Sequence, residues 1–434
     1  MVDFNSLSVD QLKELKCKLQ EEYDRFKSQN VKLDMSRGKP GADQLELSMG
    51  LFDSEIVQKY IASDGTDCRN YGVLEGIPEM RKLFADIFEI SPEEVLVGGN
   101  ASLNLMFDMI SQAMTHGVAG SDVPWGKLPS VKFLCPSPGY DRHFAICEYF
   151  NIEMITVPMK NDGPDMDLVE KLVAEDEYIK GIWCVPKYSN PDGITYSDEV
   201  VKRLANMKTK SKDFRIFWDN AYVVHHLYEE EAKQDKLMNI FKACKEAGNQ
   251  DRVFMFTSTS KITFPGAGVS AIGASVNNIN EIKKRLKIQT IGHDKLNQLR
   301  HVAFLKSVDG IKEHMKKHAE ILRPKFELVL NYFEKELGGK NIARWTKPNG
   351  GYFISLYTLK GCAKKVVSKA KEAGVTLTPA GATYPYGNDP DDSNIRIAPS
   401  YPPLNELEKV AELLCICVQL VSVEKILEMK GCTY

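Results

Sequence analysis

Residues 253–269 read VFMFTSTSKITFPGAGV, and this stretch decides how the rest of the chain is interpreted. Its first four residues form an apolar run of the kind that becomes a buried strand. A single lysine, Lys261, then stands among small hydroxyl residues, just before a glycine-rich bend. Lysine is normally a solvated surface residue, so a lysine placed where a strand enters a tight loop calls for a chemical reason.

Strands of the same kind recur on both sides of this stretch. Short apolar runs alternate with helical patterns, and the runs are VLVGG (95–99), VKFLCP (131–136), EMITVPM (153–159), GIWCVP (181–186), FRIFWDN (214–220), VFMFTS (253–258) and VSAIGAS (269–275). Continuous apolar strands separated by helices predict a mostly parallel sheet covered on both faces. We therefore predict an α/β fold with a three-layer α/β/α large domain.

The C-terminal third is organised differently. A long helical stretch is predicted after Glu281, and a shorter region of mixed strands and helices follows it. The N-terminus reads as a charged amphipathic helix that packs on this region. We predict a large domain at 50–300 and a smaller α+β domain formed by 1–49 together with 301–434.

Composition excludes several classes of protein. The chain has 434 residues, of which 43% are hydrophobic and 26% charged, and a net charge of −3, which gives no general attraction for nucleic acid or anionic membranes. No apolar run approaches the roughly 20 residues that span a bilayer. Ten cysteines without metal-ligand spacing predict a cytoplasmic protein with no disulfide and no metal site.

Four strand ends carry chemically suggestive residues, and ligands of open α/β sheets bind at such ends. After the first strand, Asn100–Ala101–Ser102 begins a helix whose free N–H groups could hold a phosphate, although glycine-rich turns of this type are common. Asn190 precedes Pro191, which is also consistent with a plain turn. Asp219 ends a buried strand three residues before Tyr222, where a helix cap is an equal alternative.

Lys261 completes this set. A single loop lysine is most often a surface residue, but a lysine in an apolar pocket or near other cations has a lowered pKa and becomes a nucleophile for Schiff-base chemistry. A phosphate cradle, a buried carboxylate, a phenol and a lysine together are what pyridoxal 5′-phosphate requires. In that interpretation Lys261 forms an aldimine with the cofactor, and Asp219 keeps the pyridine nitrogen protonated.

At this point the sequence resembles fold-type I pyridoxal-phosphate aminotransferases of class I/II over nearly the whole chain. NYGVLEGIPEMR (70–81) looks like a stretch found across this family, and strings such as SRGKPG (36–41), STSKITFPGAGV (258–269) and NIRIAPSYPP (394–403) look like a bacterial subgroup of aspartate aminotransferases. The positions that match the family's cofactor-binding residues are Tyr71, Asn100, Ala101, Ser102, Tyr140, His143, Asn190, Asp219, Tyr222, Ser258 and Lys261.

The resemblance also implies roles for these residues. Tyr140 would stack on the cofactor ring, and His143 would support Asp219 from behind. Tyr71 would reach the phosphate of a neighbouring subunit, which implies a homodimer. The positions that match substrate-binding residues are Gly38, Asn190 and Arg396, and the planar guanidinium of Arg396 would hold the substrate α-carboxylate.

The activity implied is transfer of an amino group from an L-amino acid, most simply aspartate, to 2-oxoglutarate in ping-pong fashion, with Lys261, Asp219 and Tyr222 as catalytic residues. Alternatives on the same cofactor are a transaminase of aromatic, aminoadipate or alanine–glyoxylate type, or a lyase. A non-enzymatic regulator is a further alternative, but only about 30 residues precede SRGKPG, too few for a DNA-binding domain.

Two positions depart from the family pattern. Most class I enzymes carry a phosphate-binding arginine seven or eight residues after the lysine, where this chain has Gly268 and Val269. We therefore predict a weaker electrostatic anchor for the phosphate. No arginine obviously matches the residue that binds a distal carboxylate; the candidates are Lys295, Lys39 and Arg37, each of which could equally be a surface or intersubunit residue. His225, His226 and His301 lack metal-ligand partners and are interpreted as packing residues.

Overall fold

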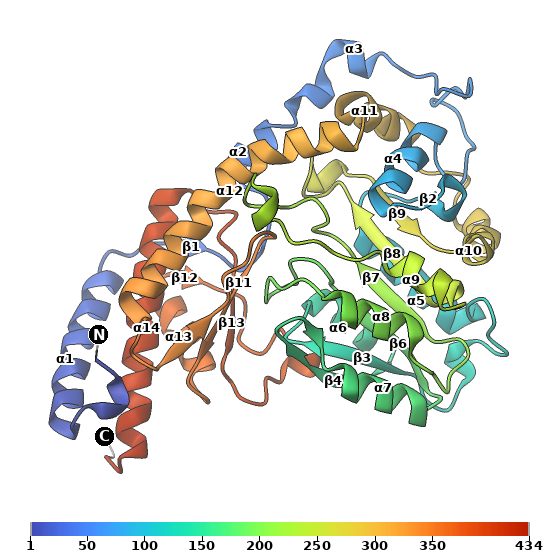
Figure 1. The fold of residues 1–434 in the computed structure, drawn as a ribbon. Coiled ribbons are helices and arrows are strands. Elements are labelled where there is room, and N and C mark those ends of the chain that lie inside the picture. The colour runs from blue at the N-terminus through green and yellow to red at the C-terminus, as the bar shows by residue number, and fades with distance from the viewer. Residues whose placement is uncertain (1, 433–434) are drawn as a thin grey trace.

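The computed structural model describes residues 2–432 and is built around an eight-stranded sheet (Figure 1). The strand order is β2-β9-β8-β7-β6-β3-β4-β5, and the pairs β8/β7, β7/β6, β6/β3 and β3/β4 are parallel. The strands are β2 (Val95–Val97), β3 (Lys132–Ser137), β4 (Glu153–Lys160), β5 (Gly163–Pro164), β6 (Ile179–Cys184), β7 (Arg215–Asp219), β8 (Val253–Ser258) and β9 (Ser270–Gly273). The mostly parallel sheet predicted from the apolar runs is confirmed.

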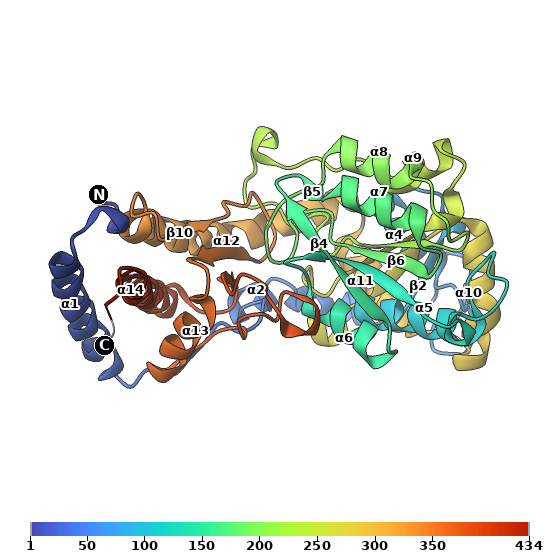
Figure 2. The ribbon, with the colours of Figure 1, turned by 90° about the horizontal axis from the view of Figure 1, so that it is seen from below.

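Helices cover both faces of this sheet (Figure 2). One face packs on α4 (Pro78–Phe88), α7 (Met166–Glu175), α8 (Asp198–Asn206), α9 (Ile240–Glu246) and α11 (Lys295–Leu305). The other packs on α5 (Ser102–His116), α6 (Asp141–Tyr149) and α10 (Val276–Gln289). Successive strand residues alternate between the two cores, so Trp218 lies in the first and Phe217 in the second. Strands buried on both faces read as continuous apolar runs, which explains the sequence pattern.

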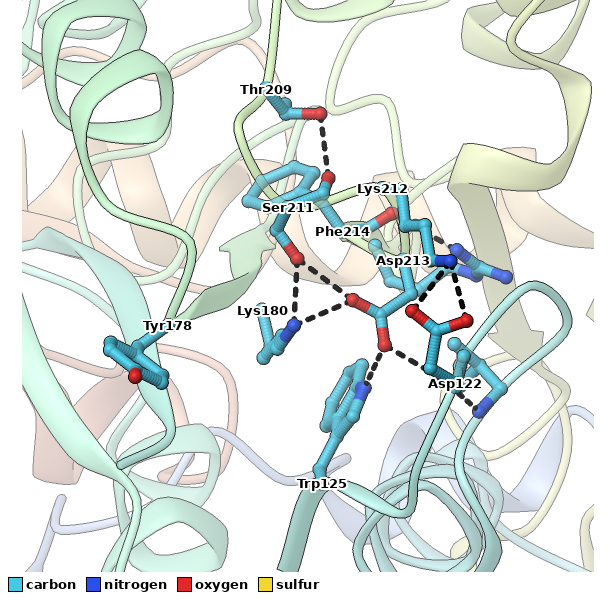
Figure 3. A network of polar contacts seen from close by, with 12 residues as sticks. Asp122, Trp125, Tyr178, Lys180, Thr209, Ser211, Lys212, Asp213 and Phe214 are labelled. Carbon is cyan, nitrogen blue, oxygen red and sulfur yellow. Dashed lines mark hydrogen bonds and ion pairs between the residues drawn. The ribbon is translucent and has the colours of Figure 1, made fainter. Parts of the chain in front are cut away.

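A buried polar network holds the amino end of the sheet (Figure 3). The Lys180 ammonium donates to Asp213 at 2.7 Å and to the Ser211 hydroxyl at 2.9 Å. Trp125 Nε1 and the Ser121 hydroxyl donate to the other carboxylate oxygen of Asp213, at 2.8 and 2.7 Å. Burial alone would raise the pKa of Asp213, but these donors bring it down to about 2. Both carboxylate oxygens are therefore satisfied, as a buried ion pair requires.

The C-terminal region forms a separate core around a three-stranded antiparallel sheet, β10 (Ala343–Trp345), β11 (Ile354–Thr358) and β13 (Asn394–Ile397). Helices α13 (Ala363–Glu372) and α14 (Leu404–Met429) pack on it, together with α1 (Val9–Lys27) from the N-terminus. A short parallel pair joins β1 (Leu33–Asp34) to β12 (Val375–Thr376). The N-terminal helix thus packs on the C-terminal region.

The long helix α12 (Val308–Leu337) belongs to both parts of the molecule. Its first turns bury Ile311 and Met315 in the core of the large sheet, and its last turns bury Phe326 and Phe333 in the C-terminal core. The long helical stretch predicted after Glu281 consists of separate helices, the end of α10 followed by α11 and α12. Two short helices, α2 (Ala42–Glu46) and α3 (Ser54–Val57), complete the set. Within residues 2–432, no helix has both the length and the apolar character that a membrane span needs.

Candidate active site

A cavity of ≈ 860 Å³ opens at the carboxyl ends of the parallel strands, between the large sheet and the C-terminal region. The arrangement follows from the topology, because parallel strands bring their carboxyl ends to one edge of the sheet. Of the residues singled out in the sequence, those that line this cavity are Gly38, Ser102, Tyr140, Asn190, Asp219, Tyr222, Lys261 and Arg396. Residues separated by more than 350 positions therefore meet at one site.

Asp219 ends β7 and is 3% exposed. Its Oδ2 lies 3.0 Å from His143 Nε2, and the His143 ring stacks on Trp183 at 4.3 Å between centroids. The other oxygen, Oδ1, is buried without a hydrogen-bond partner. A buried carboxylate oxygen left unpaired is costly unless a ligand supplies a donor, so Asp219 is poised to accept a hydrogen bond from a bound group.

Lys261 follows β8 and reaches the same cavity. Among residues 2–432 its ammonium has no hydrogen bond or ion pair, and it lies 4.8 Å from the centroid of the Tyr222 ring. Burial lowers its pKa, Asp219 acts in the opposite direction, and Arg396 lowers it further. Burial also raises the pKa of Tyr222 well above its ordinary value, so this phenol stays protonated. Lys261 is therefore an unpaired amine that loses its proton more readily than a surface lysine.

Hydroxyl and N–H groups gather at the start of α5. The residue that precedes this helix, Ala101, offers no side-chain cap, so the N–H groups of the first turn remain available. The Ser258 hydroxyl donates to Ser260 Oγ at 3.0 Å, and Ser260 Oγ donates to the Asn100 carbonyl at 3.2 Å. The Asn100 amide is used within the protein, since it donates to the Pro265 carbonyl at 3.1 Å. Ser102, in the first turn of α5, lines the cavity, so the free N–H groups of this turn are suited to bind an anion there.

The glycine-rich bend explains why an arginine is missing from it. A β-carbon at Gly268 would lie 2.8 Å from the Asn100 carbonyl oxygen and 3.3 Å from the Ser260 nitrogen. The next residue, Val269, is 2% exposed and points into the core beneath the sheet. Position 268 thus has no room for a side chain, and the side chain at 269 faces away from the donors.

Arg396 comes from β13 and spans the cavity from the C-terminal side. Its Nη1 donates to Asp141 Oδ1 at 2.9 Å and to Asn190 Oδ1 at 3.2 Å, and the guanidinium lies 5.0 Å from the Phe353 ring centroid. A β-carbon at Gly38 would collide with that same ring. Gly38 therefore lets the N-terminal segment approach the Phe353 ring closely.

Sequence reasoning missed Asp141 and Arg142, which both line the cavity. Their signal was their position directly after Tyr140, at the start of α6. Two of the three candidate cations for a distal carboxylate, Arg37 and Lys39, also line the cavity. The third, Lys295, does not; its ammonium donates to the Gly72 carbonyl at 3.0 Å.

Tyr71 stands apart from the other residues. It does not line the cavity and is 82% exposed. His225 and His301 are buried packing residues: His225 Nε2 lies 3.3 Å from the Lys261 carbonyl, and His301 Nε2 lies 2.9 Å from Thr263 Oγ1.

The residues present fit pyridoxal phosphate. The unpaired Asp219 Oδ1 suits a protonated ring nitrogen, the unpaired Lys261 amine suits the aldehyde, and the donors at the start of α5 suit the phosphate. Tyr140 lines the same cavity, where it can cover the ring.

Comparison with known proteins gives a consistent result. The sequence profile described as aspartate amino-transferase matches residues 7–430. An aspartate aminotransferase of Corynebacterium glutamicum is 46% identical over 406 residues, which cover 94% of this chain and 93% of that protein. A Mycolicibacterium smegmatis protein named as an aminotransferase is 47% identical over 428 residues, covering 98% and 99%. The crystal structure of a C. glutamicum aspartate transaminase superposes with a TM-score of 0.95 at 44% identity, covering 98% and 99%.

Proposed function

Because the chain belongs to the aspartate aminotransferase family, we propose that it transfers the amino group of L-aspartate to 2-oxoglutarate. The chain is a transaminase of the α/β type, and this family implies pyridoxal phosphate as cofactor. The proposal adds the donor, the acceptor and a ping-pong order in which the enzyme carries the amino group between two half-reactions. Transaminases of aromatic, aminoadipate or alanine–glyoxylate specificity are the alternatives.

The observation that carries the proposal is an unpaired amine and a carboxylate oxygen without a partner, Asp219 Oδ1, in one cavity that a guanidinium also lines. Bound pyridoxal phosphate supplies an electron sink that weakens the bonds to the α-carbon of an amino acid. Lys261 would be the attachment point of the cofactor and then the base that moves the α-proton, which its lowered pKa favours. Asp219 would hold the ring nitrogen in its protonated form, and Arg396 would bind the α-carboxylate.

Aspartate and 2-oxoglutarate each carry two carboxylates, so the site needs a second cation. Arg37, Lys39 and Arg142 line the cavity in addition to Arg396 and Lys261. Lys39 is held over the Tyr401 ring at 3.9 Å, whereas Arg37 and Arg142 have no ion pair among residues 2–432. This surplus of positive charge supports a dicarboxylate substrate over a monocarboxylate one.

A homodimer is part of the proposal. Large apolar side chains are exposed in two segments that meet where Gly292 lies against the Gly72 carbonyl. They are Met49, Phe52, Val57, Tyr60, Ile61, Tyr71, Ile288 and Ile291. Exposed large apolar side chains are typical of protein interfaces, and this set includes the tyrosine that would reach the neighbouring site. The large and small domains proposed from the sequence, and a cytoplasmic location, remain predictions.

Purified protein loaded with pyridoxal phosphate would be given L-aspartate and 2-oxoglutarate, with glutamate and oxaloacetate as the expected products. A panel of other donors, including phenylalanine, 2-aminoadipate and alanine, would be measured in parallel by kcat/KM. Release of pyruvate or ammonia from aspartate without glutamate would indicate a lyase. A kcat/KM for another donor above that for aspartate would contradict the proposed specificity.

A further inference from the structure

A second cavity, of ≈ 460 Å³, lies behind the active site and shares no lining residue with it. It is bounded by the end of α4, the start of α9, the first half of α12 and the ends of β7 and β8. Trp218 and Asn220 face this cavity, whereas Asp219 between them faces the active site. The end of β7 is therefore a wall between two cavities, because successive strand residues point to opposite faces.

A buried lysine lies in this second cavity. Lys187 is 8% exposed, and its ammonium donates to the Val223 carbonyl at 3.1 Å. Among residues 2–432 it meets no carboxylate. An ammonium has three donors, so two remain for another partner. Lysine is almost never buried without a paired anion, which makes this one unusual.

The two acids whose charge acts on Lys187 are already bound to other groups and do not pair with it. Asp235 and Glu89 both act on Lys187 through their charge. Asp235 already accepts from Thr195 Oγ1 at 2.7 Å and from Asn349 Nδ2 at 2.9 Å, and Glu89 pairs with Lys242 at 3.0 Å. Burial lowers the pKa of Lys187 to about 8, so the amine is still mostly protonated at pH 7. Within the described part of the chain, no carboxylate pairs directly with the positive charge that Lys187 places in the cavity.

Two further polar groups lie beside it. The Asn220 side-chain oxygen is buried without a hydrogen-bond partner. His226 lines the cavity, and its Nδ1 lies 2.6 Å from the Tyr188 hydroxyl. The remaining walls are of two kinds. Apolar side chains come from Trp218, Val224, Leu237, Met238, Ile240, Met255, Val308 and Met315, and charged ones of both signs from Asp86, Glu89, Glu229, Lys312 and Lys316. A chamber of this size that combines apolar walls with convergent polar groups is typical of a small-molecule site.

We propose that this second cavity binds a small monocarboxylate with an apolar body, the carboxylate on Lys187 and the body against Trp218 and the methionines. Asn220 accepts a hydrogen bond from a hydroxyl or protonated group of the ligand. Flexible methionine side chains adapt to aromatic or branched bodies, so the site selects for one negative charge and for size rather than for one shape. The site is independent of the chemistry proposed for Lys261.

The test uses 4-phenylbutyrate as the probe and 4-phenylbutyramide as its uncharged counterpart. Calorimetric titration of the cofactor-loaded enzyme is expected to give a dissociation constant on the order of 1 mM or tighter for the acid. Loss of the charge-assisted contact should weaken the amide by about tenfold or more. Equal affinity of the two probes, or no binding of the acid, would overturn the proposal.

Three variants locate the site. Lys187→Met should weaken the acid by about tenfold or more, while Lys316→Met, a rim lysine paired with Glu313, should leave its affinity unchanged. Arg396→Met, in the other cavity, should also leave it unchanged. Binding that survives Lys187→Met or disappears with Arg396→Met would place the probe elsewhere and refute the assignment. Should Lys187→Met not fold, the comparison of acid and amide on the unaltered enzyme decides the question.

Discussion

Buried charged groups are fully paired at the amino end of the large sheet and incompletely paired at its carboxyl end. At the amino end, Asp213 has a donor for each carboxylate oxygen and a lysine paired directly with it. At the carboxyl end, Asp219 has one oxygen unpartnered and Lys261 has neither a hydrogen bond nor an ion pair among residues 2–432. Both aspartates adjoin the same strand, β7, only six positions apart.

This difference in pairing indicates that the charged groups at the amino end stabilise the fold, whereas those at the carboxyl end serve function. A satisfied ion pair rigidifies the loops that carry it and leaves nothing for a ligand to bind. Buried charged groups without partners lower the free energy of unfolding, and that cost is recovered only when a ligand supplies the missing partners. Substitutions at the amino end should therefore change stability, and substitutions at the carboxyl end should change activity.

The largest expected effect is that of Lys261→Ala. Turnover with aspartate and 2-oxoglutarate should fall by about 10⁴-fold or more, because no other amine is placed to act as attachment point and base. The thermal unfolding midpoint of the cofactor-free protein should stay the same or rise, since the Lys261 side chain makes no hydrogen bond or ion pair among residues 2–432. Full turnover by this variant would end the proposed function.

Asp213→Ala should have the converse effect. Removal of the carboxylate leaves the Lys180 ammonium buried without its counter-charge and the Trp125 N–H buried without an acceptor, at a cost of about 3–5 kcal/mol in the free energy of unfolding. Denaturant titration measures this loss, and kcat of the folded enzyme should be unchanged. Asp122→Ala is the matched control, because it breaks the exposed pair with Lys212 seen in the same view (Figure 3) and should cost less than about 1 kcal/mol. Equal losses for the two variants would contradict the comparison.

His318, buried near the carboxyl end of the sheet, should make the stability of the protein depend on pH. It is buried on α12, where its Nδ1 lies 3.1 Å from Gln44 Nε2 and its Nε2 lies 3.0 Å from the carbonyl of Ile262, next to Lys261. Burial and the adjacent His314 lower its pKa from 6.5 to about 4. The unfolded chain therefore takes up the proton first as pH falls, so the stability from this site is complete above pH 6.5 and is lost toward pH 4.

The corresponding variant is His318→Gln. Between pH 6.5 and 4, the free energy of unfolding of the unaltered protein should fall by about 1–3 kcal/mol more than that of the variant. Denaturant titrations at several pH values measure this difference. His116→Gln, at the exposed end of α5, should keep the full pH dependence of the unaltered protein. An identical pH dependence for His318→Gln would show that this histidine is not the titrating group.

The smallest expected effect is that of Asp141→Asn. Asp141 occupies the Nη1 of Arg396 at 2.9 Å, so a substrate carboxylate competes with it for the guanidinium. Removing the charge should lower KM for the amino acid by a few-fold and leave kcat nearly unchanged. Steady-state kinetics test this, with Asp167→Asn on the distant α7 as the control. A raised KM would instead mean that Asp141 holds Arg396 in position.

The sheet and most of the residues at its carboxyl edge could be predicted from sequence because their signals are local. Strands buried on both faces leave continuous apolar runs. Asp219 is the last residue of one such strand, and Lys261 comes shortly after the end of another. The second cavity could not be predicted from the sequence. Three of its polar residues, Lys187, Asn220 and His226, come from two separate loops, and only the folded structure shows that they line one cavity. The Asp141–Arg396 pair was hidden for the same reason, because 255 positions separate its members.

The helix α12 has a consequence for how the chain comes apart. Because its two halves are buried in different cores, neither core can be dismantled without stripping apolar surface from the helix that the other needs. The molecule should therefore melt cooperatively, and a fragment that ends before residue 308 would expose the surface that Ile311 and Met315 cover. The two cores are distinct in architecture, but they should fold and unfold together as one cooperative unit.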